Sequence, residues 1–177
     1  MTATVTNTGL LEVALVLDEQ RFTGSVAEVD VVEIANRAYA AAGRSAPASI
    51  AVMLTTDSVL QDLNRRFRGR DKPTNVLSFP AAAGFGGGPA HLGDMAIAYE
   101  TTAAEARALE TPLPHHLAHL IVHGVLHLCG FDHMTRGDAE RMEAIETRLL
   151  AGLGIADPYA PPHEHGRPPR AAELGHG

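Results

Sequence analysis

Three histidines in the second half of the chain have a spacing that suits a single metal ion. The segment HGVLHLCGFDH places them at positions 123, 127 and 133. On a helix, residues four apart project from the same face, so His123 and His127 can offer ring nitrogens to one ion. Gly130 can adopt the left-handed conformation that ends a helix, which lets the chain turn back with His133. The pattern therefore predicts a three-histidine metal site.

Three neutral imidazoles around zinc leave a fourth tetrahedral position for water, which is the arrangement of a catalytic site. The metzincin peptidases share this histidine spacing, but in them a glutamate follows the first histidine and is the general base. Gly124 stands at that position here, which counts against a peptidase. Two alternatives stay open: a closed metal site that only joins two helices, and histidines that are merely hydrogen-bonded. Imidazole also suits nickel, so the resident metal is open too.

Other residues near the motif have less certain roles. His119 lies one turn before His123 and either supports a ligand, faces the substrate or is bonded to the backbone. Asp132, next to His133, could orient an imidazole or take a proton. Cys129 projects away from the face shared by the two helical ligands, so we expect it to pack in the core.

A short basic segment is the second candidate for function. The net charge of −7 argues against a protein that coats nucleic acid nonspecifically. The positive charges are nevertheless clustered within a few residues, opposed locally only by Asp71: Arg65, Arg66, Arg68, Arg70 and Lys72. We expect a localised anion site there, and for each cation other than Arg68 a solvated helix end is the alternative.

Alternating strands and helices must position these residues. Apolar periodicity and apolar runs predict strands at 11–17, 49–54, 76–79 and 94–98. Helical spacing and capping patterns predict helices from a capping box at Ser25 and Glu28 to Gly43, from 56 or 57 to 69, at 100–109, from the prolines at 112 and 114 to 128, and from 135 to 152. A glycine-rich connector spans 81–90, and we give it no role.

Length and composition indicate one folded domain with a tail. The chain has 177 residues, of which 45% are hydrophobic and 20% charged, as in ordinary globular proteins. We expect residues 1–157 to form the domain and 158–177, rich in proline, glycine and histidine, to be disordered. A single cysteine and no secretory pattern predict a cytoplasmic protein. No apolar run approaches the roughly 18 residues that span a bilayer, so we expect no membrane association.

Three segments resemble the YbeY family of bacterial endoribonucleases, which take part in ribosomal RNA maturation and ribosome quality control. They are HGVLHLCGFDH, FRGRDKPTNVLSFP at 67–80 with Leu63-Asn64 before it, and Leu92-Gly93-Asp94. The resemblance implies an α+β fold, a small mixed sheet flanked by helices with the metal-binding helix at its centre. It also implies that one zinc ion is bound by His123, His127 and His133, and that Arg68 is functionally important.

By this resemblance the protein is a zinc-dependent, single-strand-specific endoribonuclease that matures the 3′ end of 16S ribosomal RNA. Arg68 would clamp a phosphate through two guanidinium N–H groups. The weaker contacts to the RNA backbone would be Arg65, Arg66, Arg70 and Lys72, with His119 as a further substrate-binding candidate. Small-subunit ribosomal RNA is the expected partner, with ribosomal proteins or assembly GTPases as further candidates and DNA excluded.

The sequence does not choose between two routes of RNA cleavage, attack by water and attack by the ribose 2′-hydroxyl. It also identifies no general base. Two other functions remain as alternatives. One is a metal-dependent hydrolase of a peptide or ester, and the other is a ribosome-assembly factor in which zinc only stabilises the fold.

Overall fold

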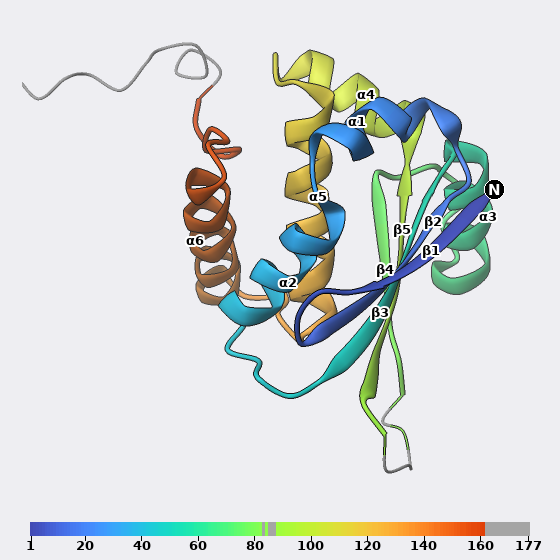
Figure 1. Ribbon diagram of the computed structural model, residues 1–177. Helices are drawn as coiled ribbons and strands as arrows, with labels where there is room; N and C mark the ends of the chain where they lie inside the picture. The colour runs from blue at the N-terminus through green and yellow to red at the C-terminus, as the bar shows by residue number, and fades with distance from the viewer. Residues whose placement is uncertain (83, 85–87, 162–177) are drawn as a thin grey trace, which may run out of the picture.

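A five-stranded mixed sheet organises the fold (Figure 1). The computed structural model describes residues 1–82, 84 and 88–161. The strands are β1 (Thr2–Asn7), β2 (Leu11–Leu17), β3 (Ala48–Thr55), β4 (Val76–Pro80) and β5 (Ala90–Ala98), in the spatial order β1-β2-β3-β5-β4. The pairs β2/β3 and β3/β5 are parallel, and β1/β2 and β4/β5 are antiparallel. Among the described residues β4 is therefore an edge strand, paired only with β5.

Helices cover both faces of the sheet. They are α1 (Thr23–Glu28), α2 (Val31–Ala41), α3 (Asp57–Arg68), α4 (Tyr99–Ala108), α5 (Leu113–Leu128) and α6 (Arg136–Gly152). α2 and α5 pack on one face, α6 packs outside them, and α3 lies on the opposite face (Figure 1). The predicted α+β class and single domain are confirmed among the described residues. None of the described helices is long and apolar enough to cross a membrane.

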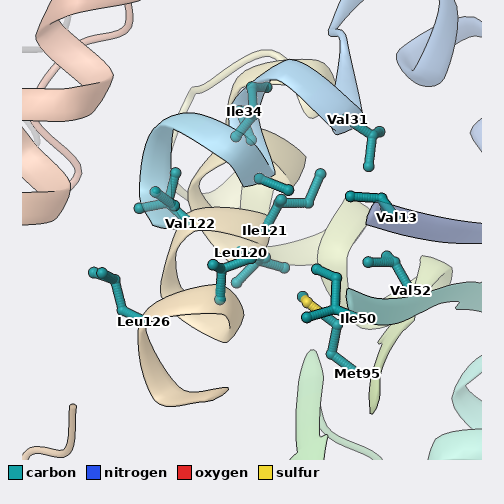
Figure 2. Packing of buried hydrophobic residues seen from close by; sticks show 14 of the residues in the cluster. Val13, Val31, Ile34, Ile50, Val52, Met95, Leu120, Ile121, Val122 and Leu126 are labelled. Atoms are coloured by element: carbon teal, nitrogen blue, oxygen red, sulfur yellow. The ribbon is translucent and has the colours of Figure 1, made fainter. Parts of the chain in front are cut away.

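The main core lies between the sheet and α5. Strand side chains such as Val13, Ile50 and Val52 meet Ile34 of α2 and Ile121 of α5 (Figure 2). A smaller cluster fills the other face under α3, because successive strand residues point to opposite sides of a sheet. α5 is buried along most of its length, with ten buried residues out of sixteen. Its polar side chains are therefore confined to one stripe.

The first helical segment differs from the prediction. The expected helix from Ser25 to Gly43 is two helices, because the backbone becomes extended at Val29 and Asp30. The side chain of Asp30 accepts a hydrogen bond from the Glu33 N–H at 2.9 Å, so Asp30 is the N-cap of α2. The predicted capping box was therefore wrong. Ser25 lies inside α1 and is buried.

Two strand assignments also differ. β1 was not predicted, because an edge strand whose residues are mostly exposed has no core-facing alternation to detect. β5 begins at Ala90, four residues before the predicted start. Within the predicted connector, residues 83 and 85–87 lie outside the described residues. Of the predicted tail, 162–177 lies outside them as well.

Gly93 allows β4 and β5 to approach each other closely. Its φ is 142°, and a Cβ atom there would lie 2.3 Å from the Phe79 carbonyl oxygen and 2.9 Å from Pro80 Cα. Both contacts are with backbone, which cannot rotate away. Only glycine therefore fits at this position.

Replacing Gly93 with alanine is expected to lower the free energy of unfolding by about 2–4 kcal/mol, through backbone strain and overpacking. Urea unfolding followed by circular dichroism would measure this. Gly137→Ala is the matched control, because Gly137 lies in α6 with no atom within 4 Å of an added Cβ. The control should stabilise the protein by up to about 1 kcal/mol through helix propensity. Equal effects of the two changes would contradict the prediction.

Candidate metal centre

The last turns of α5 and the loop after it bring three histidines together. His123 and His127 lie on one face of α5, and the helix is closed by Gly130 at φ 96°, as the sequence predicted. The Phe131 N–H donates to the Leu126 carbonyl at 3.1 Å, which turns the chain back. The His133 ring centroid then lies 5.0 Å from that of His127 and 5.8 Å from that of His123.

The ring nitrogens of the three histidines converge at a spacing that fits a metal ion. One nitrogen from each lies within 4.8 Å of the others, and the Nε2 atoms of His123 and His127 are 3.0 Å apart. Nitrogens bound to zinc at 2.0–2.1 Å in tetrahedral geometry lie roughly 3.3 Å apart. His123 and His127 therefore have the separation expected of two zinc ligands, and His133 is near enough to be the third.

His127 is held in the neutral form that binds metals. Its Nδ1 lies 2.9 Å from the Phe131 carbonyl oxygen, which can only accept, so Nδ1 carries the proton and Nε2 keeps its lone pair. Burial lowers the pKa of His127, and the neighbouring His123 and His133 lower it further. A neutral imidazole at position 127 is thus favoured.

His123 is held from behind by a carboxylate. Its Nδ1 lies 2.7 Å from Oε1 of Glu146 on α6, a residue with no exposed side-chain surface. The other carboxylate oxygen lies 3.0 Å from His119 Nε2 and also accepts from the Tyr159 hydroxyl. Burial alone would raise the pKa of Glu146, but hydrogen bonds from His119, His123 and Tyr159 outweigh it and hold the pKa at about 2.

Sequence reasoning missed Glu146 and Tyr159. The signal for Glu146 is its place on the buried stripe of α6, four residues after Met142 and four before Leu150. A carboxylate is rarely fully buried unless it is paired, so a glutamate on such a stripe points to a partner inside the protein. Tyr159 follows the predicted domain end at 157 and gave no comparable signal.

The three histidines open onto a cleft of about 550 Å³ at the edge of the sheet. Its described lining comes from the end of α3, from β4 and the residue before it, and from α5 and the loop that follows it: Arg68, Asn75, Val76, Ser78, Pro80, His123, His127, Gly130, Phe131, Asp132, His133 and Met134. The structure thus places Arg68, predicted to bind substrate, in the same cleft as the histidines. A guanidinium facing a metal site is an arrangement suited to an anionic substrate.

Arg68 is the last residue of α3 and is held against the edge strand. Gly69 has φ 66° and ends the helix, and the next residues are fixed by the buried Asn64, whose Nδ2 donates to the Lys72 carbonyl at 2.9 Å. Arg68 Nη2 donates to the Ser78 carbonyl at 3.2 Å. Within the part of the chain that the structure describes, this is the one side-chain hydrogen bond of Arg68, and it goes to a neutral group. The exposed guanidinium therefore keeps N–H donors available for another ligand.

The other predicted substrate contacts lie elsewhere. His119 lies one helical turn before His123. Among the described residues, it lines a separate cavity of about 270 Å³. Arg70 and Lys72 are exposed and are not among the described residues that line the histidine cleft. Asp132 lines the cleft, and its Oδ1 accepts from the Met134 N–H at 3.1 Å. Cys129 is buried, as predicted, and burial raises the pKa of its thiol.

Gly124 has a packing reason to lack a side chain. A Cβ atom there would lie 2.4 Å from Met95 Cε and 3.4 Å from Ser78 Oγ. Met95 is itself buried in the core, so it has little space into which to move. The position at which metzincins carry their catalytic glutamate is therefore occupied, in this fold, by the contact between α5 and the sheet.

Known proteins resemble this chain in sequence and in fold. A family model described as endoribonuclease YbeY matches residues 17–154. A Bradyrhizobium diazoefficiens protein named endoribonuclease YbeY is 53% identical over 143 residues, 75% of this chain and 78% of the relative. A protein of the same name from another Bradyrhizobium strain is 50% identical over 141 residues, 74% of this chain and 83% of the relative. A Thermotoga maritima solution structure, 19% identical with a TM-score of 0.53, covers 88% of this chain and 99% of its own, and shows the fold alone.

Replacing His133 with alanine is expected to abolish stoichiometric zinc binding, because two imidazoles remain where three converge. Elemental analysis of the purified variants would measure the zinc content. His91→Ala is the control, since His91 is also exposed but contacts Ser49 and Asp94 instead. His133 is exposed, so circular dichroism should show an intact fold. A full equivalent of zinc in His133→Ala would contradict the assignment.

Acidification is expected to destabilise the metal-free protein partly through His127. The ordinary histidine pKa is about 6.5 and applies to the unfolded chain, whereas burial lowers the pKa in the fold. As the pH falls, the unfolded state therefore binds more protons than the folded state. The contribution of neutral His127 to the free energy of unfolding is present above about pH 6.5 and is lost as the pH falls below that value. Urea unfolding at pH 7.5 and 5.5 should show a smaller loss for His127→Gln than for wild type. An equal loss in both proteins would contradict the prediction.

Proposed function

The chain belongs to the YbeY endoribonuclease family, and on this premise we propose that it cleaves RNA at the histidine cleft, with one zinc ion held by His123, His127 and His133. Arg68 binds the phosphate at the scissile bond. The observation that carries the proposal is the placement of these four side chains around one open cleft. The names of the relatives support RNA as the substrate class and cleavage as the reaction.

The donor set suits a catalytic metal. Three neutral imidazoles leave room for a further ligand, and His133 is exposed to the cleft rather than sealed by other side chains. When bound, a zinc ion supplies Lewis-acid stabilisation of phosphate oxygens and lowers the pKa of a coordinated water. This openness favours catalysis over the alternative in which zinc only stabilises the fold.

The protein's own groups have separable tasks in this proposal. The Phe131 carbonyl and the Glu146 carboxylate fix which ring nitrogens of His127 and His123 face the cleft. Arg68 orients a phosphate with N–H donors that the Ser78 carbonyl does not use, and it stabilises the negative charge that develops during cleavage. Binding to the cleft edge, rather than to a broad basic surface, is compatible with the net charge of −7.

A metal-dependent hydrolase of peptides or esters is the second function to weigh. Its general base would be a glutamate at position 124, and that position is filled by the contact of Gly124 with Met95. The packing therefore disfavours a metzincin-type peptidase. A panel of peptide and ester substrates, each tested beside single-stranded RNA, would reveal either activity directly.

We also propose the RNA substrate, the cell compartment and the protein partners of the reaction. The chain acts in the cytoplasm on single-stranded ribosomal RNA of the small subunit, at the 3′ end of 16S ribosomal RNA, and contributes to ribosome quality control. Ribosomal proteins or assembly GTPases are the candidate protein partners. Comparing ribosomal RNA ends in cells with and without the protein would test this setting, and unchanged 16S ends would refute it.

Arg68→Ala is expected to lower the rate of RNA cleavage by about 100- to 1,000-fold while zinc content stays at one equivalent, because the lost guanidinium stabilises charge in the transition state. Single-turnover cleavage of a labelled single-stranded RNA would measure the rate. Arg66→Ala is the matched control, since Arg66 lies on the same helix but pairs with Asp62. Equal rates in the two variants would remove Arg68 from the mechanism.

The products of the same assay also distinguish the two routes of cleavage. Attack by the ribose 2′-hydroxyl leaves a 2′,3′-cyclic phosphate, whereas direct attack by water leaves none. A substrate with a 2′-deoxy sugar at the cleaved position would resist only the first route. The end groups therefore identify the nucleophile without any assumption about the base.

A further inference from the structure

The most unusual charge in the described structure is that of Glu146. Its side chain has no exposed surface, and among the described residues no lysine or arginine is paired with it. Its recorded partners are His119, His123 and Tyr159. Burying a carboxylate without an opposite charge is expensive even when it is hydrogen-bonded. A positive charge that compensates Glu146 must therefore come from a group other than a described lysine or arginine.

The hydrogen bonds around Glu146 define which nitrogens carry protons. A carboxylate accepts only, so Nδ1 of His123 and Nε2 of His119 must be the N–H groups that face it. In a neutral imidazole the other nitrogen then has a lone pair. For His123 this is Nε2, the atom that lies 3.0 Å from Nε2 of His127. Glu146 thus directs the lone pair of His123 into the candidate metal centre.

His119 fits the same assignment. Its Nδ1 is buried and has no recorded hydrogen-bond partner among the described residues. With the proton on Nε2, the unpartnered atom is a lone pair and not a buried N–H group. His119 is thereby a neutral donor to the carboxylate, placed one helical turn from His123 on the same stripe of α5.

A second metal ion at this cluster is the competing explanation. Ligand atoms of His119, His123 and Glu146 also lie within 4.8 Å of one another. The 2.7 Å contact between His123 Nδ1 and the carboxylate is, however, a hydrogen-bond distance, well below the roughly 3.3 Å between two ligands of one tetrahedral zinc ion. The Tyr159 hydroxyl also donates to the carboxylate. The cluster is a hydrogen-bonded support.

Tyr159 reaches this support from the turn that follows α6. The Asp157 carboxylate accepts from the Tyr159 N–H at 2.9 Å and from Thr147 Oγ1 at 3.2 Å, which ties the turn to α6. The Tyr159 ring also contacts that of His119, with centroids 5.6 Å apart. The turn therefore contacts the support, and Tyr159 is not among the described residues that line the histidine cleft.

We propose that Glu146 is a positioning residue for the metal ligand His123, that its charge offsets the charge of the ion, and that His119 and Tyr159 hold its carboxylate in place. This inference rests on the proposed metal site. It gives His119 a supporting role behind His123 in place of the predicted substrate contact. It also makes the turn at 157–159 part of the metal centre.

Zinc affinity of Glu146→Gln, measured by competition with a chelating dye, tests the proposal. The amide keeps the size of the side chain but removes the charge, and loss of such a supporting group lowers metal affinity by about 10- to 100-fold. Glu143→Gln is the matched control: the same charge change on the same helix, at an exposed position. The control should bind zinc as tightly as wild type.

A second measurement needs no metal. Long-range proton–nitrogen correlation spectra of the metal-free protein report which nitrogen of His123 carries the proton. Wild type and Glu143→Gln should show the proton on Nδ1, and Glu146→Gln should show an increased share on Nε2. A residue that only fills space would not change this ratio. Tyr159→Phe, which removes one donor, should lower zinc affinity in the same direction by a smaller factor, and it carries the test if Glu146→Gln does not fold.

The outcomes separate this inference from the proposed function. Unchanged zinc affinity and an unchanged His123 proton position in Glu146→Gln, or unchanged zinc affinity in Tyr159→Phe where that variant carries the test, would overturn the inference and leave the nuclease proposal standing. Weaker zinc binding in Glu146→Gln, together with a wild-type protein that binds zinc but cuts no RNA, would support the inference and refute the nuclease. A wild-type protein that binds no zinc would refute both.

Discussion

The geometry of the candidate centre depends on how α5 is buried. The helix must be apolar enough to pack against the sheet and yet carry a polar stripe along one side. Ile121 and Val125 lie in the core and Gly124 faces Met95 and Ser78 of the sheet, so His123 and His127 are left to line the cleft beside β4. Because the core fixes the rotation of α5 about its axis, it also fixes where the imidazoles point. The imidazoles have defined positions because the core beneath α5 is closely packed.

The imidazoles are further constrained by acceptors from different parts of the chain. A backbone carbonyl in the loop after α5 orients His127, and a buried carboxylate on α6 orients His123. Each acceptor selects one proton position and leaves the opposite nitrogen free. The loop after α5 and the helix α6 therefore orient the imidazoles together with the core packing of α5.

The cleft lies at the edge of the sheet because β4 is the last strand. Its exposed side gives Arg68 a carbonyl to hold at Ser78 and leaves space opposite the histidines. Gly93 of β5 packs against the backbone of β4, and Gly124 of α5 packs against the side chains of Met95 and Ser78, so β4, β5 and α5 lie close together here. The same packing fills the position of a metzincin glutamate. Shared histidine spacing is thus compatible with different chemistry, since the base and the substrate contacts come from elsewhere in the fold.

Features that depend on local spacing could be predicted from the sequence alone. The i, i+4 histidines, the glycine that ends α5 and the order of strands and helices from β3 to α6 follow from helical and strand periods, and the structure confirms them. Features that depend on distant contacts could not be predicted in this way: the edge strand β1, the break at Val29 and Asp30, and the pairing of Glu146 with His123 across 23 residues. A hydrogen bond between side chains of two helices leaves no periodic pattern in the sequence. Only the packing of α6 on α5 brings that carboxylate and that imidazole together.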